Sequence, residues 1–348
     1  MAENYYSNKK KDDHIEINLT KDVGSKTTTR LDEYHFIHNA LPEADLNQID
    51  PSCVIFNRRL SFPILISSMT GGTVKGAAIN ESLAEVAQEF GIAMGLGSQR
   101  IGLEQSETMF TFNVRKIAPD ILLMANLGAV QLNYGYSIEH CQKVVDAVNA
   151  DALILHLNPL QEAIMENGDT RFSGLLKKIE QICRQIDVPV IAKEVGWGIN
   201  ARVTKKLVDA GITAVDIAGA GGTSWSQVEK FRTKNKRNQR IADAFQDWGI
   251  STVDALKEVR LAFQNLLVFA SGGLKNGVDV AKCIALGANL GGVAGEFIRA
   301  AAVSRTELHE FTDVVTEQLR IAMFCVGARN LAELNQEKIQ KFQGKNVT

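Results

Sequence analysis

The amino-acid sequence predicts an α/β fold, a (β/α)₈ or TIM barrel with an N-terminal arm and a long C-terminal helix. Three observations lead to this fold: eight short apolar runs, amphipathic segments between the runs, and glycine-rich or polar residues directly after each run. Continuously apolar runs are typical of parallel strands that are buried on both faces. A doubly wound open sheet is the second possibility, but it usually has fewer strands, so the closed barrel is favoured.

The chain begins with a polar stretch of irregular pattern. Residues 21–30 within it are rich in Thr, Ser, Lys and Gly. We interpret residues 1–60 as a partly mobile N-terminal arm that contributes substrate ligands, and residues 61–348 as the barrel. A chain of 348 residues is long enough for one barrel domain with extensions.

The pattern assigns the strands and helices in turn. The eight candidate strands are Ile64–Ser67, Ala93–Leu96, Ile121–Ala125, Ala152–Leu157, Val190–Lys193, Ala214–Ile217, Leu267–Ala270 and Leu290–Ala294. Apolar residues have helical spacing within 79–90, 138–148, 175–186, 203–208 and 256–263. Gly211 and Gly287 have the position of helix C-caps, and the stretch 306–326 predicts the long C-terminal helix.

Composition excludes several classes of protein. The net charge of −2 argues against a nucleic-acid-binding protein, which normally has a strong basic excess. The five cysteines are odd in number and irregularly spaced, so a disulfide framework is not expected. The sequence contains neither a membrane-spanning apolar run nor the apolar core of a signal peptide. We therefore expect a cytoplasmic protein with no membrane partner.

The residues that follow the strands predict where the chemistry occurs. In a (β/α)₈ barrel the active site forms at the C-terminal ends of the strands. Polar or glycine-rich clusters follow the runs at 67–72, 97–100, 126–128, 156–162, 193–194, 219–225, 271–273 and 294–296. One such cluster means little, because glycine pairs occur in most loops. Eight clusters at the same end of every unit predict one shared site.

The last two clusters indicate a phosphate site. Gly272 and Gly273 expose backbone amides without a Cβ, and Gly295 can open a short helix whose N-terminal amides face an anion. A phosphate site after the seventh and eighth strands is a recurrent feature of barrels. Gly222 and Thr223 on the neighbouring loop add an amide and a hydroxyl. The alternative is that these are ordinary turn glycines.

Lys193 ends the fifth run and is expected to point inward, as Ile191 does. A buried lysine needs an anion or an altered pKa. Three roles fit: a Schiff-base nucleophile, a cation beside the pyrimidine edge of a flavin, or one partner of a structural ion pair.

Other charged residues are candidates for binding a diphosphate and its metal. The cations among them are Lys10, Lys11, His14, Arg100 and His156. Glu162, next to Gln161, can hold a hard divalent cation, since Mg²⁺ commonly uses one carboxylate together with phosphate oxygens and water. Alternatively, Glu162 is an acid favoured at a helix N-terminus by the helix dipole.

One loop, 219–250, is unusually long and contains the basic run 230–240. Loops of this length are usually functional lids or disordered segments. A lid over the strand ends and a solvated surface excursion are both consistent with the run.

Together these clusters resemble the type 2 isopentenyl-diphosphate isomerases, a family of flavin-dependent barrels. The resemblance runs from the arm to the last strands and is carried by 10–14 (KKDDH), 68–72 (SMTGG), 97–100 (GSQR), 125–132 (ANLGAVQL), 156–162 (HLNPLQE), 193–196 (KEVG), 221–225 (GGTSW) and 270–274 (ASGGL). One departure is visible: the arm motif of the family usually begins Arg-Lys, whereas this chain has Lys10-Lys11. Lysine keeps the charge but loses the bidentate fork of arginine.

The resemblance implies roles for individual residues. The implied flavin mononucleotide (FMN) positions are Ser68, Met69, Thr70, Ser98, Asn126, Lys193, Thr223, Gly272, Gly273, Ala294 and Gly295. The implied substrate-binding positions are Lys10, Lys11, His14, Ser98, Arg100, His156 and Gln161, and Glu162 is the implied Mg²⁺ ligand. The implied catalytic positions are Gln161, Lys193, Trp225 and Glu229.

The implied reaction is a 1,3-allylic proton shift that interconverts isopentenyl diphosphate and dimethylallyl diphosphate in isoprenoid biosynthesis. Reduced FMN would serve as acid and base through its N5 edge, in a site closed to water. Lys193 would hold the anionic ring, and Gln161 would orient the hydrocarbon or the flavin edge. NADPH would only reduce the flavin, and the family suggests a homo-oligomer, either a tetramer or an octamer.

The nearest rival is an FMN-dependent barrel oxidoreductase. The 2-hydroxy-acid oxidases need a His-Arg pair after a late strand, and the inosinate dehydrogenase type needs a cysteine after the sixth strand. The loops 219–225 and 271–273 contain neither histidine nor cysteine. A flavin-free Schiff-base aldolase that uses Lys193 and a non-catalytic phosphate-binding barrel are the remaining possibilities.

Overall fold

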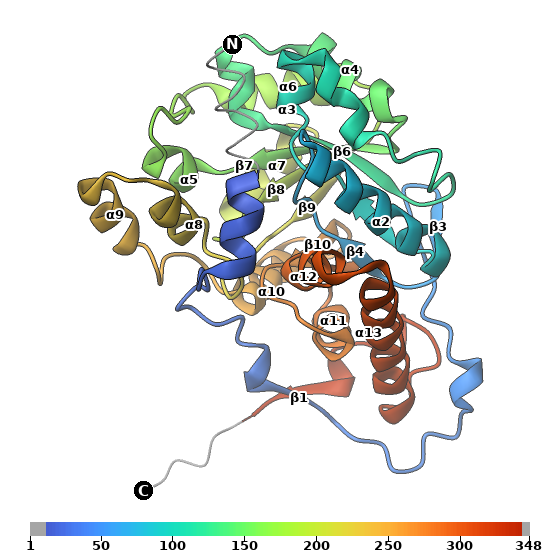
Figure 1. Cartoon of the computed structure of the whole chain (residues 1–348). Helices are drawn as coiled ribbons and strands as arrows, with labels where there is room; N and C mark the ends of the chain where they lie inside the picture. The colour runs from blue at the N-terminus through green and yellow to red at the C-terminus, as the bar shows by residue number, and fades with distance from the viewer. Residues whose placement is uncertain (1–11, 343–348) are drawn as a thin grey trace, which may run out of the picture.

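The computed structural model describes residues 12–342, and eight strands of this part close into one parallel barrel (Figure 1). The barrel strands are β4 (Ile64–Ile66), β5 (Ala93–Gly95), β6 (Leu123–Gly128), β7 (Ala152–Leu157), β8 (Val190–Glu194), β9 (Ala214–Asp216), β10 (Leu267–Ser271) and β11 (Leu290–Val293). They follow one another in chain order, and β11 pairs with β4 to close the barrel. The predicted (β/α)₈ fold is confirmed.

The third barrel strand differs most from its predicted bounds. The apolar run ends at Ala125, whereas β6 continues to Gly128. The β6 strand begins where the Leu123 amide donates to the Asp151 side chain, at 2.9 Å, and Asn126 pairs in register with Ile154 of β7. Because backbone pairing with β7 continues beyond the apolar run, the polar Asn126 lies within β6, near the C-terminal end of the barrel.

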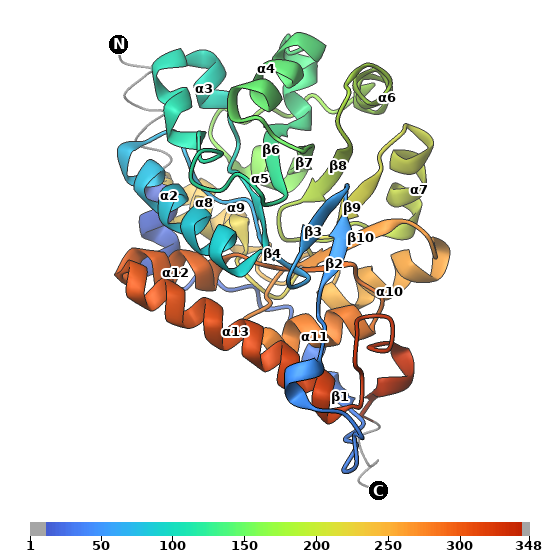
Figure 2. The same ribbon diagram turned by 90° about the vertical axis from the view of Figure 1, so that its right-hand side faces the viewer.

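An outer layer of helices surrounds the barrel (Figure 2). Its main helices are α2 (Val74–Phe90), α4 (Ile138–Val148), α6 (Leu175–Gln185), α7 (Ala201–Asp209), α10 (Thr252–Ala262), α11 (Gly277–Ala285), α12 (Gly295–Val303) and α13 (Arg305–Cys325). Helix α13 is the predicted long C-terminal helix, and it packs against α2, α11 and α12. Gly211 and Gly287 have φ values of +94° and +108° just after α7 and α11, as predicted for helix ends.

Short helical segments lie in the loops between the main strands and helices. They are α3 (Arg100–Glu104), α5 (Pro159–Ile164), α8 (Trp225–Arg232), α9 (Lys236–Asp243), and the 3₁₀ turns η1 (Leu31–Glu33), η2 (Leu46–Gln48), η3 (Ser106–Phe112), η4 (Ala129–Tyr134) and η5 (Gln336–Lys338). Among residues 12–342, no helix has both the length and the apolar character needed to cross a bilayer. The five cysteines are free thiols.

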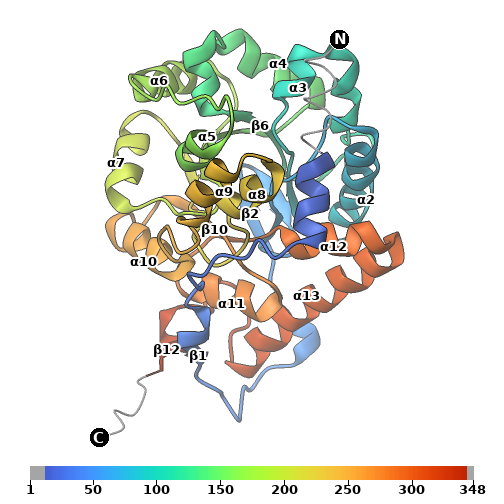
Figure 3. The ribbon, with the colours of Figure 1, turned by 60° about the vertical axis from the view of Figure 1, so that its left-hand side comes forward.

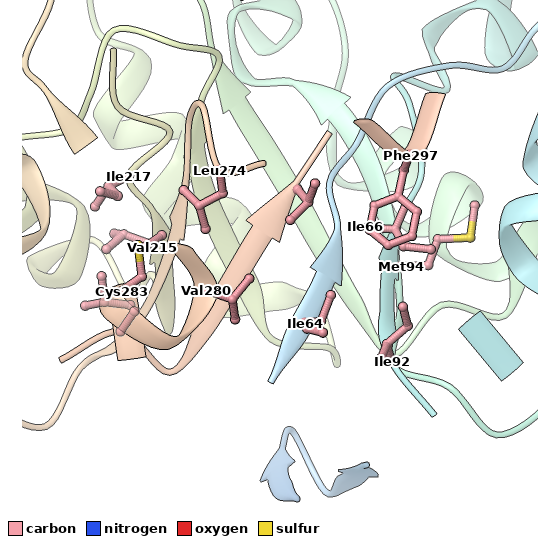
Figure 4. Close-up of a cluster of buried hydrophobic side chains, with 14 of the residues drawn as sticks. Ile64, Ile66, Ile92, Met94, Val215, Ile217, Leu274, Val280, Cys283 and Phe297 are labelled. Atoms are coloured by element: carbon pink, nitrogen blue, oxygen red, sulfur yellow. The ribbon is translucent and has the colours of Figure 1, made fainter. Parts of the chain in front are cut away.

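The core has two apolar layers, because side chains alternate in direction along each barrel strand. Ile64 and Ile66 of β4 face outward and join the helix-side core with Val280 and Phe297 (Figure 4). Leu65 lies between them in sequence and faces the barrel interior. The interior cluster consists of Ile55, Leu60, Leu65, Ala93, Leu122, Met124, Ala152, Ile154, Ile191, Ala214, Phe269 and Leu290.

Residues 12–60 contain more regular structure than their polar composition indicated. Residues 12–20 form a helix, β1 (Tyr34–Phe36) pairs with β12 (Ile339–Lys341), and β2 (Cys53–Ile55) and β3 (Arg58–Leu60) form a hairpin. Three-residue strands are too short to give a clear sequence period. Ile55 and Leu60 of the hairpin pack against the first residues of β5, β7 and β9, so the hairpin closes the N-terminal end of the barrel.

Candidate active site

All eight barrel strands end at one cavity of about 910 Å³. Each strand or the residues that follow it contribute to its wall: Ser68, Ser98, Asn126, His156, Lys193, Thr223, Gly272 and Gly295. Lys193 and the Gly272-Gly273 pair therefore share one rim, as a common cofactor site requires. The helix at residues 12–20 and α8 lie on the same side of the barrel (Figure 3) and also contribute to the wall.

Three hydroxyl groups after β4 lie ready for a polar ligand. The hydroxyl oxygens of Ser67, Ser68 and Thr70 are buried and have no hydrogen-bond partner within residues 12–342. A buried polar group without a partner costs about 1–3 kcal/mol. Met69, between them, also lines the cavity and supplies an apolar contact. This combination fits the polar and apolar parts of a flavin ring.

A second group of residues fits a terminal phosphate. Gly272 and Gly273 have φ values of +107° and +84°, which favour glycine. A Cβ on Gly272 would lie 2.0 Å from the carbonyl oxygen of Gly219, and one on Gly222 would lie 2.6 Å from the amide nitrogen of Gly273. Two loops thus pack backbone against backbone at this corner of the cavity, and only glycine allows that approach.

Helix α12 completes the phosphate corner. Ala294 and Gly295 line the cavity at its N-terminus, where the first-turn amides have no carbonyl partner inside the helix. Arg299, one turn further on, also lines the cavity, and its Nε donates to Glu296 Oε2 at 3.1 Å. The corner therefore combines glycine amides, a helix N-terminus and a guanidinium, all of which favour an anion.

Lys193 projects inward from β8 and is buried, as predicted. Its Nζ lies 2.8 Å from Asp216 Oδ2 and donates to Ser271 Oγ at 3.3 Å. Ser271 Oγ in turn donates to Asp216 Oδ1 at 2.6 Å. The structural ion pair, one of the three roles considered for Lys193, is present, and Lys193 also lines the cavity.

Arg100 lies in α3 at another part of the wall. Its Nη1 donates to Asp169 Oδ2 and its Nε to Glu104 Oε1, both at 2.6 Å. Burial alone would lower the pKa of Arg100, but the two carboxylates outweigh it and raise the pKa above its usual value. His156 Nδ1 lies 2.8 Å from Asn126 Oδ1, so a predicted flavin residue orients a predicted substrate residue.

Gln161 and Glu162 are buried in α5 and share one neighbour. Asn158 Nδ2 donates to Gln161 Oε1 at 3.2 Å and to Glu162 Oε1 at 2.9 Å. The amide of Asp169 donates to Glu162 Oε2 at 2.7 Å. Residues 12–342 contain no group of three or more His, Cys, Asp or Glu side chains placed to hold a metal. One carboxylate among amide oxygens fits Mg²⁺ when substrate oxygens and water supply the other ligands.

Glu229 of α8 connects the arm, α5 and the long loop. Its Oε1 lies 3.1 Å from His14 Nε2 and 3.2 Å from Gln161 Nε2, and its Oε2 lies 2.6 Å from Arg232 Nε. Burial alone would raise the pKa of Glu229, but His14 and Arg232 outweigh it and lower the pKa to about 2. The rings of His14 and Trp225 meet edge-on, with centroids 5.2 Å apart.

The two parts of the long loop 219–250 have different surroundings. Its first part lines the cavity with Gly222, Thr223 and Trp225. The arm pairs with this part, since Ser25 donates its amide to Gly222 O and Ser224 donates to Val23 O, both at 2.8 Å. Its second part contains α9, whose basic residues Lys236, Arg237 and Arg240 are exposed.

The structure brings nearly all predicted site residues together. Those that line the cavity are His14, Ser68, Met69, Thr70, Ser98, Arg100, Asn126, His156, Gln161, Glu162, Lys193, Thr223, Trp225, Gly272, Gly273, Ala294 and Gly295. Glu229 lies behind this wall and contacts Gln161. Lys10 and Lys11 lie outside the described residues.

Sequence reasoning missed Asp216, Asp169 and Arg299. Asp216 carried a usable signal: it is a carboxylate inside the apolar run 214–217, next to the strand that ends in Lys193, and the two residues pair in register. Arg299 also carried one, since it lies one turn after the predicted phosphate glycine Gly295. Asp169 carried none, because it lies in an irregular loop.

Comparison with known proteins places this geometry in a family. Residues 133–341 match the model of the FMN-dependent dehydrogenase family. Solved structures of flavocytochrome b2 (TM-score 0.70, 16% identity, 97% of this chain and 84% of that chain) and of a mandelate oxidase variant (TM-score 0.65, 17% identity, 97% of both chains) share the fold. At such low identity they support the barrel alone.

Closer relatives distinguish the branch of the family. The isopentenyl-diphosphate delta-isomerase of Rickettsia africae (strain ESF-5) is 50% identical over 331 residues, covering 95% of this chain and 97% of that protein. The isopentenyl-diphosphate delta-isomerase of Rickettsia bellii (strain RML369-C) is 50% identical over 332 residues, with the same coverage. The chain therefore belongs to the isopentenyl-diphosphate delta-isomerase family, built on the barrel of the FMN-dependent dehydrogenases.

Proposed function

We propose that this chain is an FMN-dependent isomerase that interconverts isopentenyl diphosphate and dimethylallyl diphosphate. The observation that carries the proposal is the 50% identity, over almost the full length of both chains, to relatives named for this activity. The cavity supports it independently, because a phosphate corner, a buried lysine and a second cationic region lie in one cavity at the ends of the strands.

Two regions of the wall would hold FMN. Gly272, Gly273 and the N-terminus of α12 would bind its phosphate, and Lys193 with the hydroxyls after β4 would face its ring. When bound and reduced, FMN supplies an electron-rich ring that can exchange a proton with the substrate and stabilise positive charge beside it. NADPH is proposed only as the reductant, because the isomerisation itself consumes no electrons.

The diphosphate would lie near Arg100 and His156, with His14 and the lysines Lys10 and Lys11 completing the grip. Arg100 is already paired with Glu104 and Asp169, so a diphosphate has to compete with two carboxylates for its guanidinium. A divalent cation relieves that competition, because it adds positive charge next to Glu162. This argument supports Mg²⁺ as the second cofactor.

Gln161 and its neighbours would organise the reacting end of the substrate. Asn158 and Glu229 fix the two ends of the Gln161 amide, which therefore keeps one orientation at the wall. Trp225 and His14 place aromatic rings at the cavity edge and would exclude water from a carbocation-like centre. We further propose a cytoplasmic homo-oligomer in which the helix at residues 12–20 and the loop 219–250 cover the C-terminal end of the barrel.

The isomerase assay separates this function from its rival. The purified FMN-loaded protein is photoreduced without oxygen and mixed with isopentenyl diphosphate and Mg²⁺, and the allylic isomer is quantified. We expect many turnovers per flavin with no stoichiometric consumption of NADPH. Consumption of one NADPH per product would instead identify a reductase, and a protein that binds no flavin would point to the Lys193 aldolase. Glu162→Gln should raise the Mg²⁺ concentration needed for half-maximal rate.

A further inference from the structure

Asp216 lies directly behind Lys193 and does not reach the cavity. Its side chain is 1% exposed, whereas Lys193 and Ser271 both line the cavity wall. Both carboxylate oxygens have close polar neighbours: Oδ2 lies in an ion pair 2.8 Å from Lys193 Nζ, and Oδ1 accepts a hydrogen bond from Ser271 Oγ at 2.6 Å. Oδ1 also accepts from the amide of Ala218 at 3.3 Å. The carboxylate is thus held by two strands and a loop.

We propose that Asp216 is a positioning residue for the isomerisation, and that it acts through Lys193 by holding the ammonium group at one point of the flavin-facing wall. The inference rests on the proposed function only in taking this cavity as the FMN site. Asp216 itself would touch neither the flavin nor the substrate.

The physical need for such a residue follows from the lysine side chain. Its four-carbon stem has several rotatable bonds, and a free ammonium group would sample many positions. A buried cation without a partner is also costly and tends to lose its proton. Asp216 removes both problems, since it pairs the charge from the side away from the cavity. The flavin would then face the positive end of an ion pair with no net charge.

A purely electrostatic view makes the opposite prediction. If Lys193 kept its place and charge without Asp216, the wall would become more positive, and the midpoint potential of bound FMN would rise. If Asp216 positions Lys193, its loss should instead lower the potential toward the value of a chain without the lysine. The sign of the shift therefore separates the two views.

The test uses Asp216→Asn, Lys193→Gln and the double variant in the FMN-loaded protein. The readouts are the midpoint potential of FMN and the turnover of isopentenyl diphosphate. We expect Asp216→Asn to lower the potential and to reduce turnover by roughly tenfold to a hundredfold, as found when a partner that orients a metal ligand is removed. In the Lys193→Gln background the same change should not lower the potential further, because the lysine through which Asp216 acts is absent. Asp216→Glu should restore part of the potential shift.

Asp151→Asn is the matched control. Asp151 is also a poorly exposed carboxylate in ion pairs, with Arg58 and Arg115, but it lies just before β7 at the other end of the barrel. This variant should lose thermal stability and keep the potential of the unaltered chain. A raised potential in Asp216→Asn, or an equal shift with and without Lys193, would overturn the proposal.

Two further measurements keep the test decisive. Should Asp216→Asn not fold, Ser271→Ala replaces it, because it removes the hydroxyl that holds Oδ1. A lowered potential that depends on Lys193 supports the proposal, and an unchanged potential contradicts it. The midpoint potential requires only bound flavin, so an unaltered chain that binds FMN but fails to isomerise would refute the proposed function and leave this coupling measurable.

Discussion

The two ends of the barrel are formed by the same eight strands, but their polar groups differ in whether they are paired. At the N-terminal end, the hairpin β2–β3 fills the opening with Ile55 and Leu60, and Leu60 is completely buried. The Asp151 carboxylate there accepts from Arg58, Arg115 and the Leu123 amide. The polar groups at this closure are paired, which is how a buried end stabilises a fold.

The C-terminal end is organised differently. The hydroxyls of Ser67, Ser68 and Thr70 have no partner within the described chain, and Gly272 and Gly273 have φ values that favour glycine. Such features cost stability and are retained where they serve a site. The well-packed N-terminal end therefore stabilises the fold, whereas the C-terminal end contains groups that cost stability and serve the site. The experiments below change residues at one end or at both ends and measure stability, ligand binding or both.

The largest effect is expected from Leu60→Ala at the closed end. It removes a fully buried side chain from the interior cluster, and such changes typically cost about 2–5 kcal/mol of unfolding free energy. Chemical denaturation measures the loss of unfolding free energy, and the flavin content of the purified protein shows whether the C-terminal end still binds FMN. FMN stoichiometry should stay unchanged in the folded protein. If FMN binding fell as steeply as stability, the N-terminal end could not be changed independently of the FMN site.

Glu229 is a paired carboxylate at the open end of the barrel, and its contribution to folding stability depends on pH. The pKa of Glu229 is lowered to about 2 from its usual value of 4.5, so its pairing stabilises the fold fully above pH 4.5. That contribution, about 3 kcal/mol at most, is lost as the pH falls from 4.5 toward 2. Glu229→Gln should therefore lower stability at neutral pH and flatten the acid limb of the stability profile. Parallel acid limbs for the two proteins would contradict the assignment.

Substituting glycine at both ends separates flavin binding from stability. Gly272→Ala puts a Cβ at a φ of +107°, 2.0 Å from the Gly219 carbonyl oxygen. Strain of this kind costs about 1–3 kcal/mol, so FMN affinity should fall by roughly tenfold or more. Gly211→Ala is the control, since Gly211 has a φ of +94° and lies before β9 at the other end. It should lose stability and bind FMN normally, as measured by titration of the flavin-free protein.

Sequence predicted the barrel well because its strands are local apolar runs bounded by glycine and polar residues. All eight strands were located, and the residues after them converge on one cavity, since the ends of parallel strands must meet at one rim. The arm was predicted less well. Strand β1 pairs with β12 from the other end of the chain, and no local period indicates such a contact.

The site shows the same division between local and distant information. Lys193 could be placed on the inner wall from its position in the run, but its partner Asp216 belongs to another strand. The family resemblance implied a catalytic position at Glu229, but it did not indicate the contacts with His14 and Gln161, which join three distant segments. Contacts between segments depend on packing geometry, which a single sequence does not contain.

The smallest effect is expected from exchanging arginine for lysine at each end. Arg100 at the open end is partly exposed and donates to Glu104 and Asp169, and Arg100→Lys keeps the charge but loses the fork. We expect KM for isopentenyl diphosphate to rise by about tenfold or less, roughly 1 kcal/mol, with turnover nearly unchanged. Arg115→Lys is the matched control, because Arg115 donates to Asp151 and to carbonyl groups at the closed end. It should lower thermal stability and leave KM unaltered, whereas an equal rise in KM for both variants would show that Arg100 has no direct part in binding the diphosphate.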